Sequence, residues 1–480
     1  MKSANKRVAV IGAGISGLTA ALRLQQRGAD VTLYEGSNHA GGVIRSEQRD
    51  GFLLEHGPDC FVSNKPAGLA LCAELGIEPE LISTNDAHRR SFILYKGKLE
   101  PLPQGFFLLA PTTIEALRGA SILSLAGKIR LARELFIPPR KESGDESLAS
   151  FVERRLGREA LDRIAQPIVA GIYTADPARL SVQATFPQFL EMERKHGSIL
   201  RALRHNAKQR GEESKAAGPR YGIFVSFKRG MQTLIDALRA KLTGVDLQLN
   251  TRVTGLHLKG ERWQLDSSAE RGARSAESPK TPDPGPRTPD FDAVVLALPA
   301  HAAAKLLSPV AAELATELAA IPYANSAVVN FAFKREQIKH ALDGMGFVVP
   351  AIENRNIVGC SFSSVKFAGR APEGFALMRV FMGGALQPEI AQWDDNRVRD
   401  AALAELREVV GARGEPVFAT ISRHRGSMAQ YEVGHLERVA RIESLTGKLP
   451  GLALAGNGFT GIGIPDCIRV ATDAAKALRA

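Results

Sequence analysis

The chain has 480 residues, a length that predicts about three domains at about 150 residues per domain. Hydrophobic residues make up 44% of it and charged residues 24%, proportions typical of a globular protein and unlike those of a disordered chain or a membrane bundle. The net charge of +11 comes in large part from residues 101–220, which contain 19 Lys or Arg against 13 Asp or Glu. No apolar run is long enough to span a membrane, and the N-terminus does not resemble a signal peptide, so we expect a cytoplasmic protein.

The first 35 residues predict a strand, a glycine turn, a helix and a second strand. Residues 8–11 form a short apolar run typical of a buried parallel strand, residues 18–26 are strong helix formers, and residues 31–35 form another apolar run. This order is that of a complete βαβ unit. We therefore expect an α/β protein whose first domain has a Rossmann-like parallel sheet.

The turn between the first strand and the helix carries a dinucleotide-binding motif. It reads Gly12, Ala13, Gly14, Ile15, Ser16 and Gly17, and Glu35 ends the second strand 18 residues later. In such a motif the first glycine permits the tight turn, the second lets the backbone approach a pyrophosphate, the third allows close packing of helix and strand, and the acidic residue binds a ribose. The helix N-terminus offers free N–H groups to the phosphates.

Residues 101–200 favour helices, and residues 118–141 form a basic segment within them. This segment has six basic residues and one acidic residue, and its apolar residues recur at a spacing that a helix could place on one face. Such a helix either lies on an anionic membrane surface or covers a core with a solvated basic side, and both interpretations stay open. Nucleic acid is a poorer candidate partner, because aromatic residues make up 6% of the chain and no nucleic-acid-binding module is present.

Two later segments predict that the first domain is discontinuous. Residues 291–298 and 452–455 are apolar runs like the first strand, so we expect them in the same sheet. Residues 205–220 are polar, and residues 266–290 contain five prolines and no large apolar residue, so both are expected to be flexible insertions. The four cysteines have no metal-binding spacing and are expected to be reduced thiols, with no metal site.

Two further glycine segments resemble those of the flavin amine oxidase superfamily. Gly41 and Gly42 follow the second strand, and residues 454–466 again read strand, glycine loop and helix. The resemblance implies FAD as the cofactor. It also implies that FAD is held, in addition to the N-terminal motif, by Gly36, Gly41, Gly42, Val43, Gly57, Pro58, Asp59, Val253, Gly456, Asn457, Ile462, Gly463 and Ile464.

Over nearly its whole length the chain resembles the oxygen-dependent protoporphyrinogen oxidases, through residues 54–59, 94–103, 166–173, 344–350 and 430–435. Ser91 and Met345 stand where that family often has an arginine and a phenylalanine, which resembles the bacterial branch that includes coproporphyrinogen oxidases. The resemblance implies a flavoprotein oxidoreductase of haem biosynthesis that oxidises protoporphyrinogen IX to protoporphyrin IX. Hydride would pass to FAD, and O2 would reoxidise FAD to give H2O2. Coproporphyrinogen III as the substrate, a general amine oxidase, and a flavin-binding scaffold without turnover remain alternatives.

The resemblance also implies three lobes and several partners. The FAD domain would comprise residues 1–88, 221–300 and 426–480, a mixed α+β substrate domain residues 89–100 and 301–425, and a helical domain residues 101–220. The helical domain is associated with membranes in many members, so residues 118–141 are candidates for peripheral contact with the inner face of the cell membrane. A ferrochelatase that takes over the product and a second copy of the chain are further candidate partners.

A porphyrinogen needs a pocket with apolar walls and a cation at its mouth, because it is an apolar macrocycle that carries propionates. The candidate wall residues are Ile172, Met345, Phe347 and Phe381, each of which could instead be an ordinary core residue. Arg89 is the candidate propionate ligand or else a solvated surface arginine, and His56 and His424 are candidates for proton transfer or for structural hydrogen bonds. No protein side chain is expected to be catalytic, since flavin N5 carries the chemistry.

Overall fold

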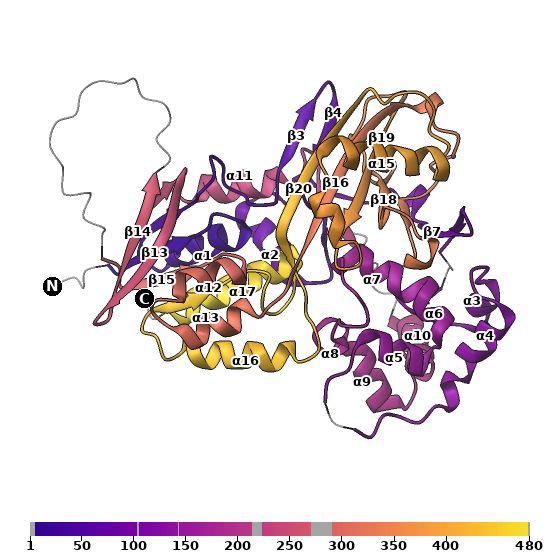
Figure 1. Cartoon of the computed structure of the whole chain (residues 1–480), viewed down its shortest axis with the longest axis horizontal. Helices are drawn as coiled ribbons and strands as arrows, with labels where there is room; N and C mark the ends of the chain where they lie inside the picture. The colour runs from indigo at the N-terminus through magenta and orange to yellow at the C-terminus, as the bar shows by residue number, and fades with distance from the viewer. Residues whose placement is uncertain (1–4, 103–104, 143, 214–222, 270–289, 479–480) are drawn as a thin grey trace.

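The computed structural model describes residues 5–102, 105–142, 144–213, 223–269 and 290–478. They form three regions (Figure 1). One is built on a parallel sheet at the left of the view, one on a larger sheet at the upper right, and one consists of helices at the lower right. We call them the parallel-sheet, large-sheet and helical regions.

The parallel-sheet region collects strands from the start, middle and end of the chain. Its five strands are all parallel, in the order β12 (Val245–Gln248), β2 (Asp30–Tyr34), β1 (Arg7–Ile11), β15 (Ala293–Leu296) and β21 (Leu452–Leu454). The strands expected at residues 8–11, 31–35, 291–298 and 452–455 are all present, and they lie in this one sheet.

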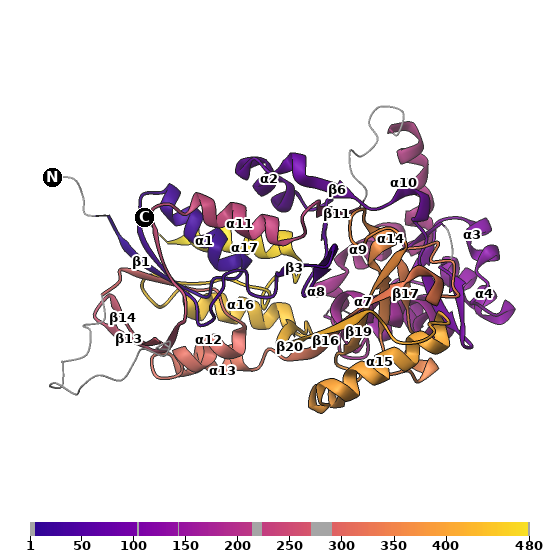
Figure 2. The same ribbon diagram turned by 90° about the horizontal axis from the view of Figure 1, so that it is seen from above.

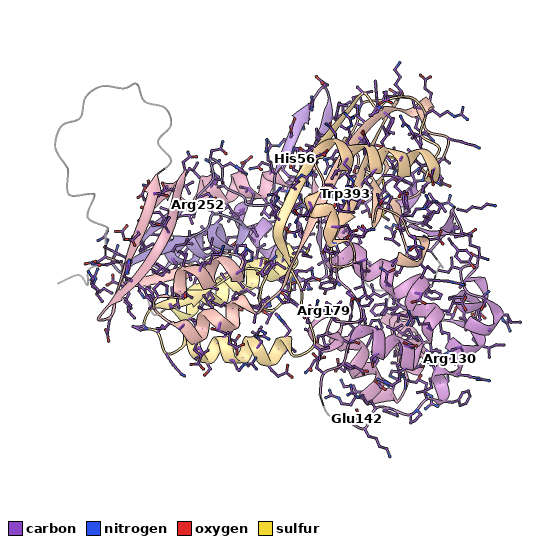
Figure 3. All side chains as sticks on the ribbon, viewed as in Figure 1. His56, Arg130, Glu142, Arg179, Arg252 and Trp393 are labelled. Atoms are coloured by element: carbon purple, nitrogen blue, oxygen red, sulfur yellow. The ribbon has the colours of Figure 1, made fainter. Side chains whose placement is uncertain are left out.

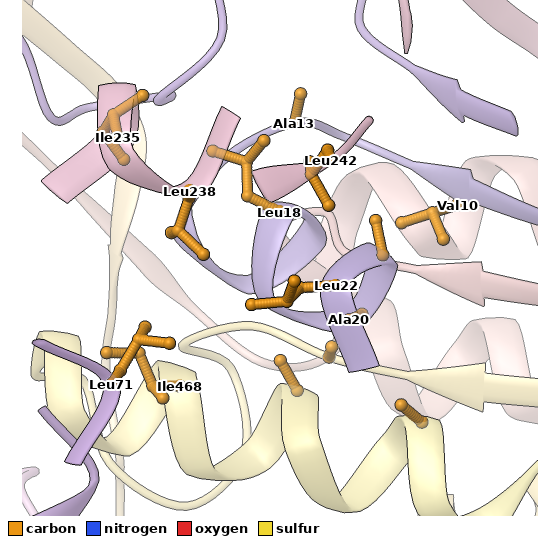
Figure 4. Close-up of a cluster of buried hydrophobic side chains, with 14 of the residues drawn as sticks. Val10, Ala13, Leu18, Ala20, Leu22, Leu71, Ile235, Leu238, Leu242 and Ile468 are labelled. Atoms are coloured by element: carbon orange, nitrogen blue, oxygen red, sulfur yellow. The ribbon is translucent and has the colours of Figure 1, made fainter. Parts of the chain in front are cut away.

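Both faces of the parallel sheet are buried around its central strands, which is why β15 and residues 8–11 of β1 are continuously apolar. Val8 and Val10 of β1 point to one face, where they meet helices α1 (Ile15–Gln26), α2 (Pro66–Leu75), α11 (Gln232–Lys241) and α17 (Ile464–Ala477) (Figure 4). Ala9 and Ile11 point to the other, which is covered by strands β13 (Thr251–Lys259) and β14 (Arg262–Ala269) and helices α12 (Ala300–Leu307), α13 (Ala312–Ala319) and α16 (His435–Thr446).

The large-sheet region has seven strands and two unlike faces. Their order is β20 (Phe418–Ala429), β16 (Tyr323–Lys334), β19 (Phe375–Gly383), β18 (Gly359–Phe362), β17 (Gly346–Val348), β7 (Phe92–Tyr95) and β8 (Lys98–Pro101). One face packs on helix α15 (Asp395–Val409) through a phenylalanine- and methionine-rich core. The opposite face is turned toward the other two regions, as shown by the packing of Leu377 on Phe52 and Leu54 of the parallel-sheet region.

Smaller strand pairs connect the parallel-sheet and large-sheet regions. β3 (Ser46–Arg49) and β4 (Phe52–Glu55) form a hairpin, and β11 (Phe224–Phe227) pairs between β5 (Phe61–Val62) and β6 (Leu81–Ser83). Seen from above, the β3–β4 hairpin lies where the two regions meet (Figure 2).

The helical region packs around its own apolar core. It contains two short strands, β9 (Phe106–Phe107) and β10 (Ala110–Pro111), and the helices α3 (Ile114–Gly119), α4 (Leu125–Ala132), α5 (Leu148–Arg155), α6 (Arg158–Ala160), α7 (Gln166–Tyr173), α8 (Val182–Thr185), α9 (Pro187–His196) and α10 (Ile199–Glu213). The α7 helix reaches the large sheet, since a Cβ on Gly171 would lie 3.4 Å from Val348.

The structure corrects part of the expectation of two flexible insertions. Helix α10 extends to Glu213, and strand β14 extends to Ala269, so residues 205–213 and 266–269 are regular structure. Their side chains are polar, but the backbone hydrogen bonds of a helix and of a strand pair are sufficient to give these residues regular structure. Residues 214–220 and 270–289 lie outside the described residues. None of the helices in the described residues is both long and apolar enough to cross a membrane.

Candidate functional site

The turn between β1 and α1 contains two kinds of glycine. Gly12 has a φ of +98° and donates its N–H to Tyr34 O at 2.8 Å, and a Cβ on Gly17 would overlap the Gly12 carbonyl oxygen. Gly14 differs, because a Cβ there would meet no heavy atom within 4 Å. The fold itself thus requires Gly12 and Gly17, whereas Gly14 borders open space. Helix α1 begins at Ile15 without a side-chain cap, so its first N–H groups border the same space.

Glu35 follows β2 and reaches back to this turn. Its Oε2 accepts the Ala13 N–H at 2.8 Å and its Oε1 accepts the Ser37 N–H at 2.9 Å. The carboxylate is therefore oriented beside the glycine turn by backbone donors. A Cβ on Gly36 would lie 3.6 Å from Arg252, and Val253 next to it in β13 is buried in the core on that side of the sheet. Figure 3 labels Arg252 at this end of the molecule.

The second glycine pair lies directly on the first turn. Gly41 donates its N–H to Ala13 O at 2.8 Å, and a Cβ on Gly42 would be 3.3 Å from Gly14 Cα. Farther along, a Cβ on Gly57 would overlap the carbonyl oxygen of Val43. Gly14, Gly42, Val43 and Gly57 thus form one continuous stretch of packed backbone, which is exposed at Gly42 and buried at Gly57 and from which the Val43 side chain projects 48% exposed. We call it the glycine wall.

The C-terminal glycine loop joins β21 to α17. Gly456 has a φ of +130°, and Gly463 is the N-cap of α17 without a side-chain cap bond, so the first N–H groups of this helix are also free of a cap. Ile464 begins the helix and is buried, and Ile462 just before it is partly buried.

Tyr431 and Asn457 hold this loop in place. The Tyr431 hydroxyl donates to Asn457 O at 2.7 Å and accepts the Gly461 N–H at 2.9 Å. Asn457 in turn donates its side-chain amide to Ser427 O at 2.7 Å. Burial raises the pKa of Tyr431 well above its usual value, so the hydroxyl keeps its proton.

Asp59 is the one carboxylate among the predicted cofactor-binding residues besides Glu35, and its side chain is used within the protein. It forms ion pairs with Lys366 at 2.9 Å, which ends helix α14 (Ser363–Lys366), and with Arg379 of β19 at 3.2 Å. Burial acts to raise the pKa of Asp59, but the charges of Lys366 and Arg379 outweigh it and lower the pKa well below its usual value. Pro58, which precedes it, is partly buried.

Three of the predicted substrate-contacting residues lie on the large sheet, directly beside one of its strands, or on the helix that reaches it. Phe381 of β19 is partly exposed and lies against the Arg379 guanidinium, 5.1 Å from its ring centre. Ile172 is 43% exposed on α7, the helix that packs on β17. Met345 directly precedes β17 and is partly exposed.

The structure does not bring Phe347 and Arg89 together with these three. Phe347 points to the opposite face of the sheet, where it is buried with Phe362, because side chains alternate along a strand. Arg89 is 62% exposed and ion-paired with its near neighbour Asp86. It lies after the short helix Asp86–His88, before β7.

The two candidate histidines both take part in hydrogen bonds between regions. His56 contacts Ser422 Oγ at 2.7 Å and Glu47 at 2.8 Å, and His424 donates to His56 O at 2.8 Å. Burial lowers the pKa of His424, which favours its neutral form. These contacts fit the structural interpretation of the two residues. Figure 3 labels His56 at the junction of the two sheet regions.

The basic segment buries some of its apolar side chains, among them Ile122 and Leu131, and exposes others. Leu125 is 75% exposed, Ile129 50% and Phe136 81%. Arg130 points inward and donates to three backbone carbonyls, those of Glu153, Arg154 and Arg155. The expectation that the apolar positions share one helix face is wrong, because Ile122 is buried and Leu135 packs against the core of the helical region, whereas Leu125, Ile129 and Phe136 are directed to solvent.

The comparisons with known proteins decide the family. The flavin-containing amine oxidoreductase family matches residues 15–479. This chain belongs to that family. It is 32% identical to the coproporphyrinogen III oxidase of Bacillus subtilis (strain 168), over 98% of this chain and 97% of that protein, and 35% identical to the one of Propionibacterium freudenreichii subsp. freudenreichii, over 96% and 88%. A crystal structure of a candidate protoporphyrinogen oxidase from an Exiguobacterium species superposes with a TM-score of 0.85 at 28% identity, covering 99% of this chain and 98% of that one.

The resemblance inferred from the motifs is thereby confirmed, and the chain is an FAD-dependent oxidoreductase of the α/β class. The residues present fit FAD. The glycine wall exposes backbone where a Cβ on Gly14 would point into open space, and two uncapped helix N-termini, those of α1 and α17, offer N–H groups to negatively charged or polar parts of the cofactor. Gly14, Gly42, Val43 and Gly463 are the residues that would hold it. When bound, FAD supplies the acceptor for two electrons and a proton.

Sequence reasoning missed Lys366 and Arg379, which meet the predicted residue Asp59. A signal existed for Arg379, because it is the one charged residue within the otherwise apolar strand β19. Charged residues are almost never buried without a partner, so such a position predicts an ion pair. No sequence signal marks Lys366, because its partner lies 307 residues away.

Proposed function

We propose that this enzyme oxidises a porphyrinogen to the corresponding porphyrin and that its preferred substrate is coproporphyrinogen III. The observation that carries the proposal is the similarity, over nearly the whole chain, to two relatives named coproporphyrinogen III oxidase. Protoporphyrinogen IX, which the motifs suggest first, is the second candidate, and it is favoured by the name of the similar crystal structure. Porphyrinogen and porphyrin differ by six electrons, so a two-electron cofactor would have to act three times, and O2 would take up its electrons and be reduced to H2O2.

The chain's own residues supply position and surroundings for this reaction. Phe381 on the large sheet and Ile172 on α7 offer apolar surface, which suits a flexible, apolar macrocycle. The Arg379 guanidinium on this face of the large sheet is bonded to Gly57 and Asp59 within the protein. We therefore place the macrocycle against Phe381, Ile172 and Met345, and do not include Phe347.

The test is porphyrin fluorescence in air, with purified enzyme given coproporphyrinogen III and protoporphyrinogen IX in parallel at matched concentrations. We expect faster formation of coproporphyrin, with peroxide released. Faster formation of protoporphyrin would make the second candidate the substrate. No turnover of either, with FAD bound, would contradict the proposal and favour a flavin-binding scaffold.

We also propose that the exposed side of residues 118–141 lies on an anionic membrane surface. Leu125, Ile129 and Phe136 project apolar groups, and Arg118 and Arg133 are exposed nearby with positive charge. Apolar insertion and attraction to anionic lipids act together in such surfaces. Dimerisation and transfer of the product to a ferrochelatase stay predictions.

Sedimentation with lipid vesicles tests the membrane proposal. We expect binding to vesicles that contain anionic lipid and weaker binding to neutral ones. Phe136→Ser should lower the bound fraction, whereas Val417→Ser, which changes an apolar residue that is 51% exposed on the large-sheet region, should not. Equal binding of the two variants would contradict the proposal.

A further inference from the structure

A buried cluster of charged side chains lies where the glycine wall meets the large sheet. Lys366 forms its ion pair with Asp59 at 2.9 Å and also donates to Cys60 Sγ at 3.4 Å. Arg379 forms its ion pair with Asp59 at 3.2 Å and donates to the carbonyl oxygen of Gly57. The relative exposure of these three charged side chains is 13% or less. The cluster therefore ties the segment that contains Gly57 and Asp59 to the large-sheet region.

The cluster holds more positive than negative charge. Arg370, also buried, donates to Ser226 and Phe227 close by, so three cations stand near two carboxylates, Asp59 and Glu55. Burial raises the pKa of Glu55 to about 7, which reduces its negative charge at neutral pH. At least one positive charge is thus uncompensated, and a buried charge without a counter-charge is costly. A negative charge that is added next to this cluster is therefore stabilised by its excess positive charge.

The position of Arg379 shows where an added negative charge would be stabilised. Its guanidinium donates to Gly57, which forms the end of the glycine wall, and it lies 5.1 Å from the ring centre of Phe381, on the substrate side. Its Nε has no hydrogen-bond acceptor among the described residues. One guanidinium therefore contacts both a residue of the cofactor wall and a residue proposed for the substrate. The excess charge lies at the junction where cofactor and substrate would meet.

We propose that Lys366 and Arg379, with Asp59 as their partial counter-charge, are positioning residues that set the reduction potential of FAD. Hydride transfer from a methylene bridge of the substrate adds two electrons and one proton to the cofactor, hence one negative charge, while a substrate nitrogen releases a proton to solvent. The uncompensated positive charge favours this reduced form. Asp59 limits the effect, because its negative charge opposes that of the two cations.

The test is the midpoint potential of the purified holoenzyme, measured by dye-coupled reduction. Lys366→Met should lower the equilibrium constant for reduction about tenfold, the effect of one charge across about 10 Å at an effective dielectric constant of about 20. Tenfold corresponds to about 30 mV for a two-electron couple. Lys366→Arg, which keeps the charge, should restore most of the wild-type value.

Asp59→Asn separates this role from a merely structural one. Loss of the carboxylate leaves both cations uncompensated, so the potential should rise, opposite in sign to the effect of Lys366→Met. Structural damage would move both variants in the same direction. Arg438→Met is the matched control. It breaks the 2.8 Å ion pair between Arg438 on α16 and Glu317 on α13, which lies outside the cluster, and it should leave the potential unchanged.

A second measurement covers variants that bind FAD weakly. Sulfite forms a negatively charged adduct with flavins, and its dissociation constant is read from the spectral change of the flavin that is bound. It should rise in Lys366→Met and fall in Asp59→Asn. Shifts of the same sign, no shifts, or complete loss of FAD in both variants would overturn the proposal. Neither measurement uses a porphyrinogen, so a wrong substrate assignment would not affect the outcome.

Discussion

The glycine wall and the helical region orient functional surfaces in different ways. In the glycine wall, backbone packs on backbone: Gly17 on Gly12, Gly42 on Gly14 and Gly57 on Val43. In the helical region, the surface is held by an ion pair between Arg155 and Glu134, which are both fully buried. Glu134 also accepts the N–H groups of Ile199 and Leu200 at the start of α10.

The difference lies in what each arrangement leaves exposed. The glycine wall presents N–H and carbonyl groups to a polar cofactor, and it depends on the absence of side chains. The Glu134–Arg155 pair fixes the short helix Arg133–Phe136, so that the apolar ring of Phe136 projects 81% exposed. Steric fit thus governs the first region and charge pairing governs the second.

The largest expected effect separates two glycines of the same turn. Gly14→Leu should leave the thermal stability of the apoprotein unchanged, because its side chain enters open space, yet weaken FAD binding at least about a thousandfold, which is about 4 kcal/mol. Gly17→Ala should instead destabilise the fold, because its Cβ overlaps the Gly12 carbonyl oxygen. Flavin absorbance after gel filtration and the melting temperature of the apoproteins measure the two effects. Full flavin content in Gly14→Leu would refute the first expectation.

The next effect concerns the charge pair of the helical region. Arg155→Met leaves Glu134 buried without its counter-charge, and we expect a loss of about 3 kcal/mol in the free energy of unfolding. Arg158→Met, three residues along and 67% exposed, should change it by less than about 0.5 kcal/mol. Urea unfolding followed by circular dichroism compares them. Equal losses would show that the buried pair is no more important than a surface pair.

A pH-dependent effect is expected at the junction between the glycine wall and the large sheet. Burial is the main cause that raises the pKa of Glu55 to about 7, against the lowering effect of hydrogen bonds from Ser46 and the Met231 N–H. The folded protein therefore binds a proton that the unfolded chain releases, and its stability falls as the pH rises from about 4.5 to about 7. Glu55→Gln removes this loss, so its stability relative to wild type should increase by about 2 kcal/mol between about pH 5 and about pH 8. A difference that does not depend on pH would exclude a raised pKa.

The smallest expected effect is on the exposed side of the helical region. Phe136→Ser removes a ring that is 81% exposed, so the free energy of unfolding should change by less than about 0.5 kcal/mol even though vesicle binding falls. Urea unfolding in the absence of lipid measures it. A large loss would mean that Phe136 stabilises the fold, and the contrast between Phe136 and Arg155 would disappear.

The sequence by itself was sufficient for the parts of the site that depend on local sterics. A strand, a glycine turn and a helix follow one another within 26 residues, and Glu35 returns to the same turn through one hydrogen bond to Ala13. The four strands that were predicted from apolar runs lie in one parallel sheet, and they are apolar because both faces of that sheet are buried. Short-range geometry and burial leave a direct imprint on residue type, so these features could be predicted.

Only the tertiary structure decided the rest, for two physical reasons. Strand alternation and pairing determined that Phe381 faces the site while Phe347 faces the core, and both residues look alike in the sequence. Ion pairs joined Asp59 to Lys366 and Arg379. Both of these residues lie more than 300 positions after Asp59 in the chain. A buried ion pair needs two charges at one point in space, and no local pattern records where the second one will come from.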